Sequence, residues 1–414
     1  MTTHHANSKV FLAYSDITRL KILELLREGE KSATELLEKV GSGQSTLSHH
    51  MKILIDSEAV IARKEHKWTY YSINEKGAHD AQKLLRYLTS KKTTVKTASD
   101  PKNITKLRRT ETVKPFTIVV DTSCDLTPEY IKENELEVMP IPFVLDGEEH
   151  NEGYWQKISG KEYYDALRNG SIAKTSQINP DAFVKSYTEY AKQGRDVIYI
   201  LLSSGLSATY QSSQIALADI KEKYPDSNIF PIDSISATTV STLLVYTAVT
   251  KRNEGFSAEE TAAILEQKKN YMFGIFTVDD LMYLHRGGRL SKLSAVGGSI
   301  LGIKPILNIN PDGTLGLKEK ARGRENSLKF LVSQMERSLA PGSVVETLLI
   351  PHADCEEDAK KLAKLASEAF EIKNTEITLM CPVIGAHVGP GIVALVYESD
   401  ITRQEFEDEY YSKK

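Results

Sequence analysis

The stretch QSTLSHHMKIL occupies residues 44–54. A helix that begins near Ser45 would place Leu47, Met51 and Leu54 on one face, at positions i, i+4 and i+7. The polar side chains then face outward, which suits a helix that reads base edges in the major groove of DNA. The residues of this helix that we expect to contact DNA are Gln44, Ser45, Thr46, Ser48, His49 and Lys52.

The flanking sequence completes a winged helix-turn-helix pattern. Helical spacing of apolar residues appears at 17–26 and 33–40, and Gly41 to Gly43 interrupts the chain before the third helix. Residues 60–73, VIARKEHKWTYYSI, alternate apolar and polar residues around a charged turn, which predicts a β-hairpin wing. The wing residues that we expect to neutralise phosphates are Arg63, Lys64 and Lys67. The order of elements predicts an α+β DNA-binding domain.

Charge is divided unevenly along the 414 residues. Residues 1–113 hold 20 of the 52 Lys and Arg and 13 of the 56 Asp and Glu, a balance of +7, so the remainder carries −11. A basic segment favours DNA as its partner. The alternative is a helical protein-interaction module whose polar residues are simply solvated. We expect His50, beside the apolar stripe, to be packed and not to read bases.

Cysteine usage and hydropathy exclude several classes of protein. Cys124, Cys355 and Cys381 form no CxxC pair, so neither a disulfide framework nor a thiolate metal site is indicated. The N-terminus MTTHHANSKV lacks the apolar core of a signal peptide, and no window approaches the roughly 18 apolar residues of a spanning helix. We therefore expect a cytoplasmic protein with no membrane insertion, no resident metal and no cofactor.

The rest of the chain predicts an α/β domain behind a linker. Residues 89–115 are polar and rich in Lys and Thr, which is typical of a tether. Helical stretches at 208–222 and 237–250 alternate with apolar strands, and this order predicts a largely parallel sheet. The predicted strands are 116–121, 136–147, 196–202, 228–233, 273–277, 304–310, 344–350 and 392–397.

Small polar residues follow several of these strands, where ligands bind in open α/β sheets. The loops are Thr122–Asp125, Lys174–Gln177 and Ser203–Tyr210. Hydroxyls and free amides at a helix N-terminus suit a carboxylate or phosphate. In a single loop, helix capping explains such residues equally well, whereas several loops together favour an anion site. A phosphate-binding loop and a dinucleotide fingerprint are absent, and SSGLS lacks the flanking glycines of the hydrolase elbow. A hydrolase that uses SSGLS is therefore the weakest alternative.

Residues 9–88 resemble the ArsR-type winged-helix repressors through DITRLKILELL, QSTLSHHMKIL and the wing that ends in WTYYSI. The resemblance implies a dimer on a palindromic DNA operator. Metal-sensing members commonly carry a cysteine pair on the second helix, but residues 30–36 here read EKSATEL. His79 and Asp80 alone do not make a coordination set. The signal is therefore expected to enter elsewhere in the chain.

Residues 116–398 resemble the DegV family, whose members are two-lobed α/β fatty-acid-binding proteins. The matching motifs, in family order, are VVDTSCDL, KTSQ, SSGLSATYQS, IDSIS, LHRGGRLS, IKPIL, ARGR and VIGAHVGPG. The resemblance implies that Thr175 and Ser207 bind the carboxylate, with Ser204 and the backbone of Gly205 nearby. Further support for the head group is implied for Arg289 and His387. We expect a binding protein with no catalytic residues and a long-chain fatty acid as its ligand.

The match to this family is incomplete at three points. Val388 stands where Thr is usual, Cys124 where Ala is common, and Thr238-Thr239 near a position often held by Gly. The missing hydroxyl at Val388 weakens the prediction that a partner kinase phosphorylates the bound carboxylate more than it weakens the prediction of head-group binding.

The two halves together predict a dimeric transcriptional regulator whose DNA binding responds to fatty acid. The alternative is an acyl carrier that serves a separate fatty acid kinase and has an accessory DNA-binding module.

Overall fold

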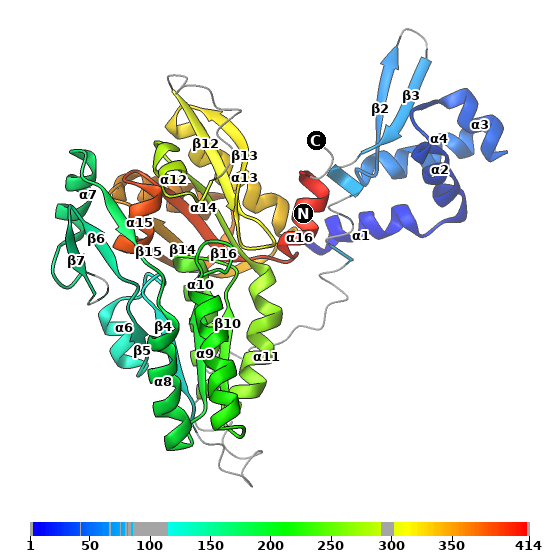
Figure 1. The fold of residues 1–414 in the computed structure, drawn as a ribbon. Coiled ribbons are helices and arrows are strands. Elements are labelled where there is room, and N and C mark those ends of the chain that lie inside the picture. The colour runs from blue at the N-terminus through cyan, green and yellow to red at the C-terminus, as the bar shows by residue number, and fades with distance from the viewer. Residues whose placement is uncertain are drawn as a thin grey trace. The chain divides into compact units, whose positions relative to one another are not determined.

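The computed structural model shows two compact units, an N-terminal one and a larger C-terminal one (Figure 1). The described residues are 3–41, 43–65, 68–74, 76–78, 81, 84–85, 115–151, 153, 155–290 and 302–411. The predicted linker, residues 89–115, lies outside them except for its last residue. The predicted domain bounds of 9–88 and 116–398 therefore stay predictions.

The N-terminal unit is a winged helix-turn-helix, as predicted. Its helices are α1 (Thr3–Tyr14), α2 (Ile17–Arg27), α3 (Ala33–Val40) and α4 (Gln44–Asp56). Its strands pair antiparallel in the order β1-β3-β2, and they are β1 (Lys31–Ser32), β2 (Val60–Glu65) and β3 (Trp68–Ile73). The hairpin of β2 and β3 is the predicted wing. The turn between these strands, including Lys67, lies outside the described residues.

Local signals in the sequence set these helix ends. The Asp16 carboxylate accepts the backbone N–H of Arg19 and caps α2. Ser32 and Glu35 form a reciprocal capping box at the start of α3. Gly41 ends α3 with a φ of 72°, a left-handed conformation that glycine adopts without a steric penalty. Because these contacts are local, the bounds of α2 and α3 could be predicted closely.

The core of the N-terminal unit confirms the predicted apolar stripe on α4. Leu47, Met51 and Leu54 are buried against a cluster that includes Ile22 and Leu36. Burying each of these side chains contributes about 1.5–3 kcal/mol. The stripe fixes which face of α4 packs inward and therefore which face is left for solvent or DNA.

His50 is packed against α2, as expected. Its Nδ1 lies 3.4 Å from Nη1 of Arg19 and 3.6 Å from the carboxylate of Asp16. Arg19 is itself buried and donates to the carbonyls of Leu12 and Ala13 at the end of α1. His50 thus joins α4 to α2 and does not face outward with the polar residues of α4.

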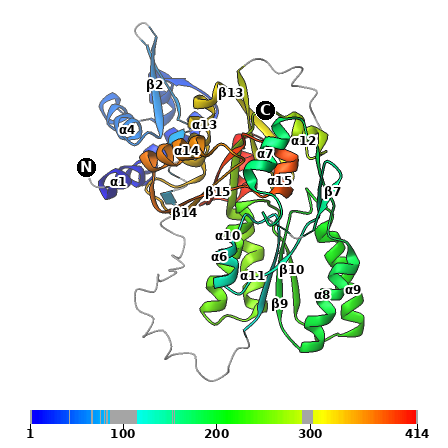
Figure 2. The ribbon, with the colours of Figure 1, turned by 90° about the vertical axis from the view of Figure 1, so that its left-hand side faces the viewer.

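A four-stranded parallel sheet forms one part of the C-terminal unit, with helices on both faces (Figure 2). Its strand order is β10-β9-β4-β5, made by β4 (Thr117–Asp121), β5 (Glu137–Met139), β9 (Val197–Leu201) and β10 (Ile229–Asp233). The helices are α6 (Pro128–Glu133), α8 (Pro180–Gln193), α9 (Thr209–Lys223), α10 (Thr239–Asn253) and α11 (Ala258–Lys268). The parallel sheet predicted from the alternation of strands and helices is confirmed here.

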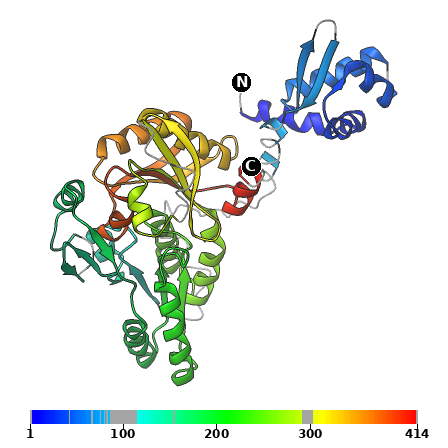
Figure 3. The ribbon, with the colours of Figure 1, turned by 45° about the horizontal axis from the view of Figure 1, so that its top comes forward.

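The second sheet differs from that expectation because it is mixed. Its order is β13-β12-β11-β16-β14-β15, and only β14 and β15 run parallel (Figure 3). The strands are β11 (Met272–Thr277), β12 (Ile303–Ile309), β13 (Leu315–Arg322), β14 (Val344–His352), β15 (Glu371–Leu379) and β16 (Val393–Glu398). Helices α13 (Arg324–Ser338) and α14 (Glu356–Ala369) pack on it, and α10 contacts strands of both large sheets.

A small antiparallel sheet corrects one predicted strand. Residues 136–147 form β5 in the parallel sheet and β6 (Phe143–Leu145) in a separate sheet of order β7-β6-β8. Pro140 and Pro142 lie between β5 and β6, and proline cannot donate to a strand ladder. The neighbouring elements are β7 (Glu148–His150), α7 (Gly160–Arg168) and β8 (Ala173–Thr175). The remaining short elements are η1 (Lys269–Tyr271), α12 (Met282–Arg286), α15 (Pro382–Val388) and α16 (Arg403–Tyr410).

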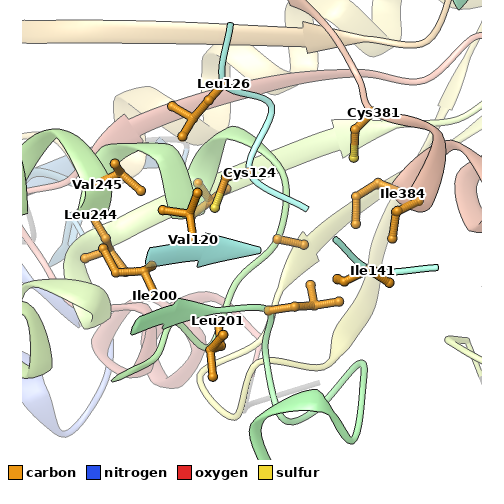
Figure 4. Packing of buried hydrophobic residues seen from close by; sticks show 14 of the residues in the cluster. Val120, Cys124, Leu126, Ile141, Ile200, Leu201, Leu244, Val245, Cys381 and Ile384 are labelled. Carbon is orange, nitrogen blue, oxygen red and sulfur yellow. The ribbon is translucent and has the colours of Figure 1, made fainter. Parts of the chain in front are cut away.

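The main core lies between α10 and the central strands of the parallel sheet. Figure 4 shows Val120 of β4 and Ile200 of β9 beside Leu244 and Val245 of α10. All five residues of β4 and all five of β9 are buried, which explains their continuous apolar runs. Cys124 and Cys381 are buried thiols that take part in no disulfide.

Candidate functional site

A cavity of about 260 Å³ lies inside the C-terminal unit. Its walls come from α10, β11, β12, α15 and β16, together with the loops that follow β8 and β9. Most of the lining is apolar, as at Val240, Phe276, Ile309 and Val396. A largely apolar pocket with a few polar groups is the usual form of a small-molecule site. The polar lining residues are Thr175, Ser176, Gln177, Ser207, Thr238, Arg289 and His387.

Two polar residues of the cavity contact each other directly. Thr175, at the end of β8, places its Oγ1 2.7 Å from Nε2 of His387 on α15. Both residues were predicted from the family motifs to lie at a head group. The structure brings them together because α15 packs against β8.

His387 is an uncharged imidazole at neutral pH. Burial, together with the charge of Arg289, lowers the pKa of His387 to about 4. Its Nδ1 is buried without a hydrogen-bond partner among the described residues. A Cβ on Gly287 would lie 2.4 Å from this nitrogen, so only glycine leaves room for the ring. A neutral imidazole can donate one hydrogen bond and accept one.

Arg289 places a positive charge at this polar corner. Its Nε donates to the carbonyl of Leu206 and its Nη1 to the carbonyl of Gly287. Half-burial lowers the pKa of Arg289, but an arginine stays charged in a protein. The corner therefore combines a hydroxyl, an imidazole and a guanidinium, which suits an anionic group.

The loop after β9 contributes Ser207 to the cavity but not its two predicted neighbours. The Oγ of Ser207 lies 3.0 Å from Oγ1 of Thr209, the first residue of α9. Ser204 and Gly205 do not line the cavity. Their backbone N–H groups already donate, to the carboxylate of Asp233 and to Oγ of Ser203 respectively.

Gly205 has a packing role in this loop. A Cβ there would lie 2.8 Å from the backbone of Gly313 in the turn between β12 and β13. The same turn accepts a hydrogen bond from Oγ of Ser203 at the carbonyl of Gly313. The loop is thus pressed against the hairpin, and only its end at Ser207 reaches the cavity.

A second hollow, of about 350 Å³, adjoins the polar corner. It shares Thr175, Arg289 and His387 with the first cavity. Lys174 and Arg286 add positive charge to its lining. A group bound at the shared residues would therefore border the apolar cavity on one side and a more polar space on the other.

The predicted DNA-contacting residues of α4 all lie on its exposed face. Gln44, Ser45, Thr46, Ser48, His49 and Lys52 are each exposed to solvent. Arg63 and Lys64 are exposed on β2, and the Arg63 guanidinium pairs with Glu30 and Glu65 at 3.0 and 2.7 Å. The structure thus places one polar helix face and one basic strand on the surface of the same unit.

The geometry of the described residues does not favour a metal site or a hydrolase site. The described residues contain no group of three or more His, Cys, Asp or Glu that could hold a metal ion. His79 and Asp80 lie outside the described residues. Among the described contacts of the SSGLS hydroxyls, Ser203 bonds to Gly313 and Ser207 to Thr209, and neither contact involves a histidine. This arrangement does not favour the hydrolase alternative.

No helix in the described part of the chain combines the length and the apolar character that crossing a bilayer would need.

Sequence reasoning gave no binding role to four polar residues around the cavity, namely Ser176, Gln177, Thr238 and Asp125. Thr238 lines it, and Asp125, which is buried, accepts the hydroxyl hydrogen of Thr238. Thr238 appeared only as a departure from a family pattern, and Asp125 only as the end of a polar loop. The sequence signal that could have pointed to Asp125 is its place four residues after the end of β4, a strand that is buried throughout.

Known protein families match both halves of the chain. Residues 115–400 match the family described as uncharacterised proteins of the DegV family, and residues 16–61 match bacterial regulatory proteins of the arsR family. A DegV domain-containing protein of Clostridium perfringens is 37% identical over 288 residues, which cover 70% of this chain and 99% of that protein. A relative from Streptococcus pyogenes is 34% identical, with 68% and 96% covered.

Solved structures show the same fold. A fatty acid binding DegV family protein of Streptococcus agalactiae is 28% identical, with a TM-score of 0.61, and the match covers 69% of this chain and 99% of that one. A Thermotoga maritima protein described as revealing a fatty acid binding function is 27% identical, with a TM-score of 0.59 and the same coverage. The chain therefore belongs to the DegV family and carries an additional N-terminal winged helix of the arsR type.

Proposed function

We propose that the protein is a transcriptional regulator whose DNA binding is modulated by a bound long-chain fatty acid. The observation that carries this proposal is the apolar cavity with a polar corner at Thr175, Arg289 and His387, in a chain that also bears an exposed recognition helix. Relatives of the same fold are described as fatty acid binding. The apolar walls suit an acyl chain, and the corner suits its carboxylate.

The energetics favour a ligand with a long tail. Burying about fourteen methylenes contributes roughly 11 kcal/mol before the costs of association, at about 0.8 kcal/mol each. A hydrogen bond to a charged group contributes about 1.5–3 kcal/mol. Hydroxyls at Thr175 and Ser207 would therefore orient the carboxylate, while the apolar walls supply most of the affinity.

Two sites in one chain make a regulator possible. A coupling of about 1–3 kcal/mol between fatty acid and DNA changes operator affinity by about 5- to 150-fold. The direct base contacts would come from Gln44, Ser45, Thr46, Ser48, His49 and Lys52, and phosphate contacts from Arg63, Lys64 and Lys67. Leu12, Ile17 and Leu20 are 50, 86 and 45% exposed, and such apolar surface favours a homodimer on a palindromic operator.

A specific observation favours a second candidate function. The hollow beside the polar corner shares Thr175, Arg289 and His387 with the acyl cavity, which would leave a bound carboxylate accessible from the polar side. An acyl carrier that presents fatty acid to a separate kinase needs such access. Val388 lines the cavity where the family usually has a hydroxyl, so this function is the alternative and not the main proposal.

The test uses the full-length protein and DNA that it selects from a random pool. Mass spectrometry of extracted lipid is expected to show a long-chain fatty acid. Operator affinity is then compared with and without hexadecanoic acid, for the wild type and for Ser207→Ala. The expected result is a lipid-dependent change of at least about 5-fold that the variant loses at the same lipid concentration. Affinity independent of lipid in the wild type, with lipid bound, would contradict the regulator and leave the carrier.

A further inference from the structure

The carboxylate of Asp125 lies just behind the wall of the acyl cavity. Asp125 follows β4, is 6% exposed and does not itself line the cavity. One carboxylate oxygen accepts the backbone N–H of Cys381 at 2.7 Å, and the other accepts the hydroxyl of Thr238. Thr238 lies 113 residues and Cys381 256 residues from Asp125 in the chain. One buried side chain therefore joins three distant segments.

One partner of Asp125 lines the cavity, and the other is the N-cap of a helix that lines it. Thr238 lines the cavity directly, just before α10. Cys381 is the N-cap of α15, the helix that contributes Val383, Ile384 and His387 to the lining. A shift of either segment would change the space that is open to an acyl chain.

The start of α15 is held at three consecutive residues. Tyr164 donates its hydroxyl to the carbonyl of Met380 at 2.7 Å, and Tyr163 donates to the carbonyl of Pro382 at 2.8 Å. Asp125 holds the intervening residue, Cys381, through its N–H. Of these three side chains, Asp125 is the one that also bonds Thr238 on another wall.

Thr238 needs such a partner because its backbone is strained. Its φ of 55° and ψ of −147° fall in a region that is nearly restricted to glycine. A non-glycine residue keeps this conformation only when its surroundings hold it. The hydroxyl bond to Asp125 is a partly buried side-chain contact that restrains it.

From this geometry we propose that Asp125 is a positioning residue that sets fatty-acid affinity by holding Thr238 and the start of α15 on one carboxylate. The proposal rests on the fatty-acid binding proposed above. It assigns a role in binding to a residue that does not touch the ligand.

The charge of Asp125 offers a readout that a purely structural role lacks. Burial raises the pKa of Asp125 to about 6, against the lowering effect of its bonds from Thr238 and Cys381. An ionised carboxylate accepts both bonds, whereas the neutral acid can accept one and must donate in the other. We therefore expect the hold on the two walls to weaken as the pH falls through about 6.

Other titratable groups surround this carboxylate. Asp121 and Cys124 lie on the same segment, Tyr164 on α7 and Cys381 before α15, and burial raises the pKa of each. The two thiols and the phenol are neutral near pH 6, whereas Asp121 is a second carboxyl group. The pH profile of the wild type must therefore be compared with that of a variant in which Asp125 alone cannot ionise.

The experiment measures the Kd for hexadecanoic acid from about pH 5 to pH 8, together with the thermal unfolding midpoint, in the full-length protein. Asp125→Ala is expected to weaken binding by at least about 10-fold at pH 7. Asp125→Asn, which accepts from Cys381 and donates to Thr238 as the neutral acid does, is expected to keep, at every pH, about the affinity that the wild type has below pH 6, and to lose the pH step near 6. Thr238→Val removes the same hydroxyl bond from the Thr238 side and is also expected to weaken binding. This variant keeps the proposal testable if Asp125→Ala does not fold.

Tyr397→Phe is the matched control. Tyr397 is buried on β16, bonds Ser338 at 2.7 Å and does not line the cavity. It is expected to lower the unfolding midpoint without changing the Kd. Wild-type affinity in both Asp125→Ala and Thr238→Val, or an equal loss in Tyr397→Phe, would overturn the positioning role. An unchanged pH step in Asp125→Asn would also overturn it. A wild type that binds no fatty acid would instead contradict the proposed function itself.

Discussion

Oγ1 of Thr175 lies 2.7 Å from Nε2 of His387, although 212 residues separate the two in the chain. The contact orients the imidazole ring, and either atom can be the donor because a hydroxyl can both donate and accept. It also places a hydroxyl and a neutral imidazole at the same corner of the cavity.

Ser207→Ala is expected to weaken fatty-acid binding by about 10- to 150-fold, because it removes a hydrogen bond to a carboxylate worth about 1.5–3 kcal/mol. Fluorescent-probe displacement or calorimetry measures the change. Ser204→Ala is the matched control, since Ser204 lies in the same loop but does not line the cavity. Equal losses in the two variants would show that the loop, and not the Ser207 hydroxyl, decides affinity.

The contribution of His387 to the unfolding free energy of the lipid-free protein is expected to be lost as the pH is lowered from about 6.5 to about 4. The raised pKa of Asp125 acts in the opposite direction over this range, so the difference between the wild type and a variant without His387 is the quantity to compare. Burial and Arg289 lower the pKa of His387 to about 4, so the unfolded chain binds a proton in this range that the folded protein does not. Lowering the pKa of His387 from 6.5 to about 4 corresponds to roughly 3 kcal/mol. Urea unfolding at several pH values, for the wild type and His387→Gln, isolates this contribution. A variant whose pH profile parallels that of the wild type would contradict a buried, neutral His387.

Ala394→Leu is expected to shift ligand preference toward shorter acyl chains by about two to three carbons. Ala394 is buried and lines the apolar part of the cavity, so the larger side chain occupies volume that methylenes would fill. Competition among fatty acids of different length measures the preference. Leu395→Met changes the adjacent residue of β16, which does not line the cavity, and should leave the preference unchanged.

Lys64→Ala and Gln44→Ala are expected to affect DNA binding differently. Loss of a phosphate contact at Lys64 should weaken specific and non-specific binding alike and reduce the salt slope by about 1. Loss of a base contact at Gln44 should cost about 1–3 kcal/mol on the selected site only. Lys9→Ala, at an exposed position on α1, is the control. A Gln44→Ala variant that loses affinity equally for all DNA would remove this residue from sequence reading.

Local physics explains most of what could be predicted from sequence. The Asp16 cap, the capping box of Ser32 and the left-handed Gly41 each act within a few residues, so α2 and α3 could be placed closely, whereas α1 was not predicted. The buried stripe of α4 follows from spacing alone. The direction of β11 to β16 could not be predicted, because strand direction depends on connections that periodicity does not encode.

The candidate site could be predicted only in part. Family motifs pointed to Thr175, Ser207, Arg289 and His387, and all four line one cavity. The same reasoning pointed to Ser204 and Gly205, but the backbone N–H of Ser204 donates to Asp233 and Gly205 packs against the β12–β13 turn. Neighbours in a motif can point in different directions once the loop packs, so a motif does not specify which side chains reach a ligand.

The sequence by itself determined the two-part organisation, the polar face of α4 and the residue types available for a carboxylate, because these depend on composition and local spacing. Only the tertiary structure decided that Thr175 meets His387, that His387 is neutral and that Asp125 joins Thr238 to the start of α15. The physical reason is that each of these properties depends on burial and on contacts across more than a hundred residues, which no local pattern specifies.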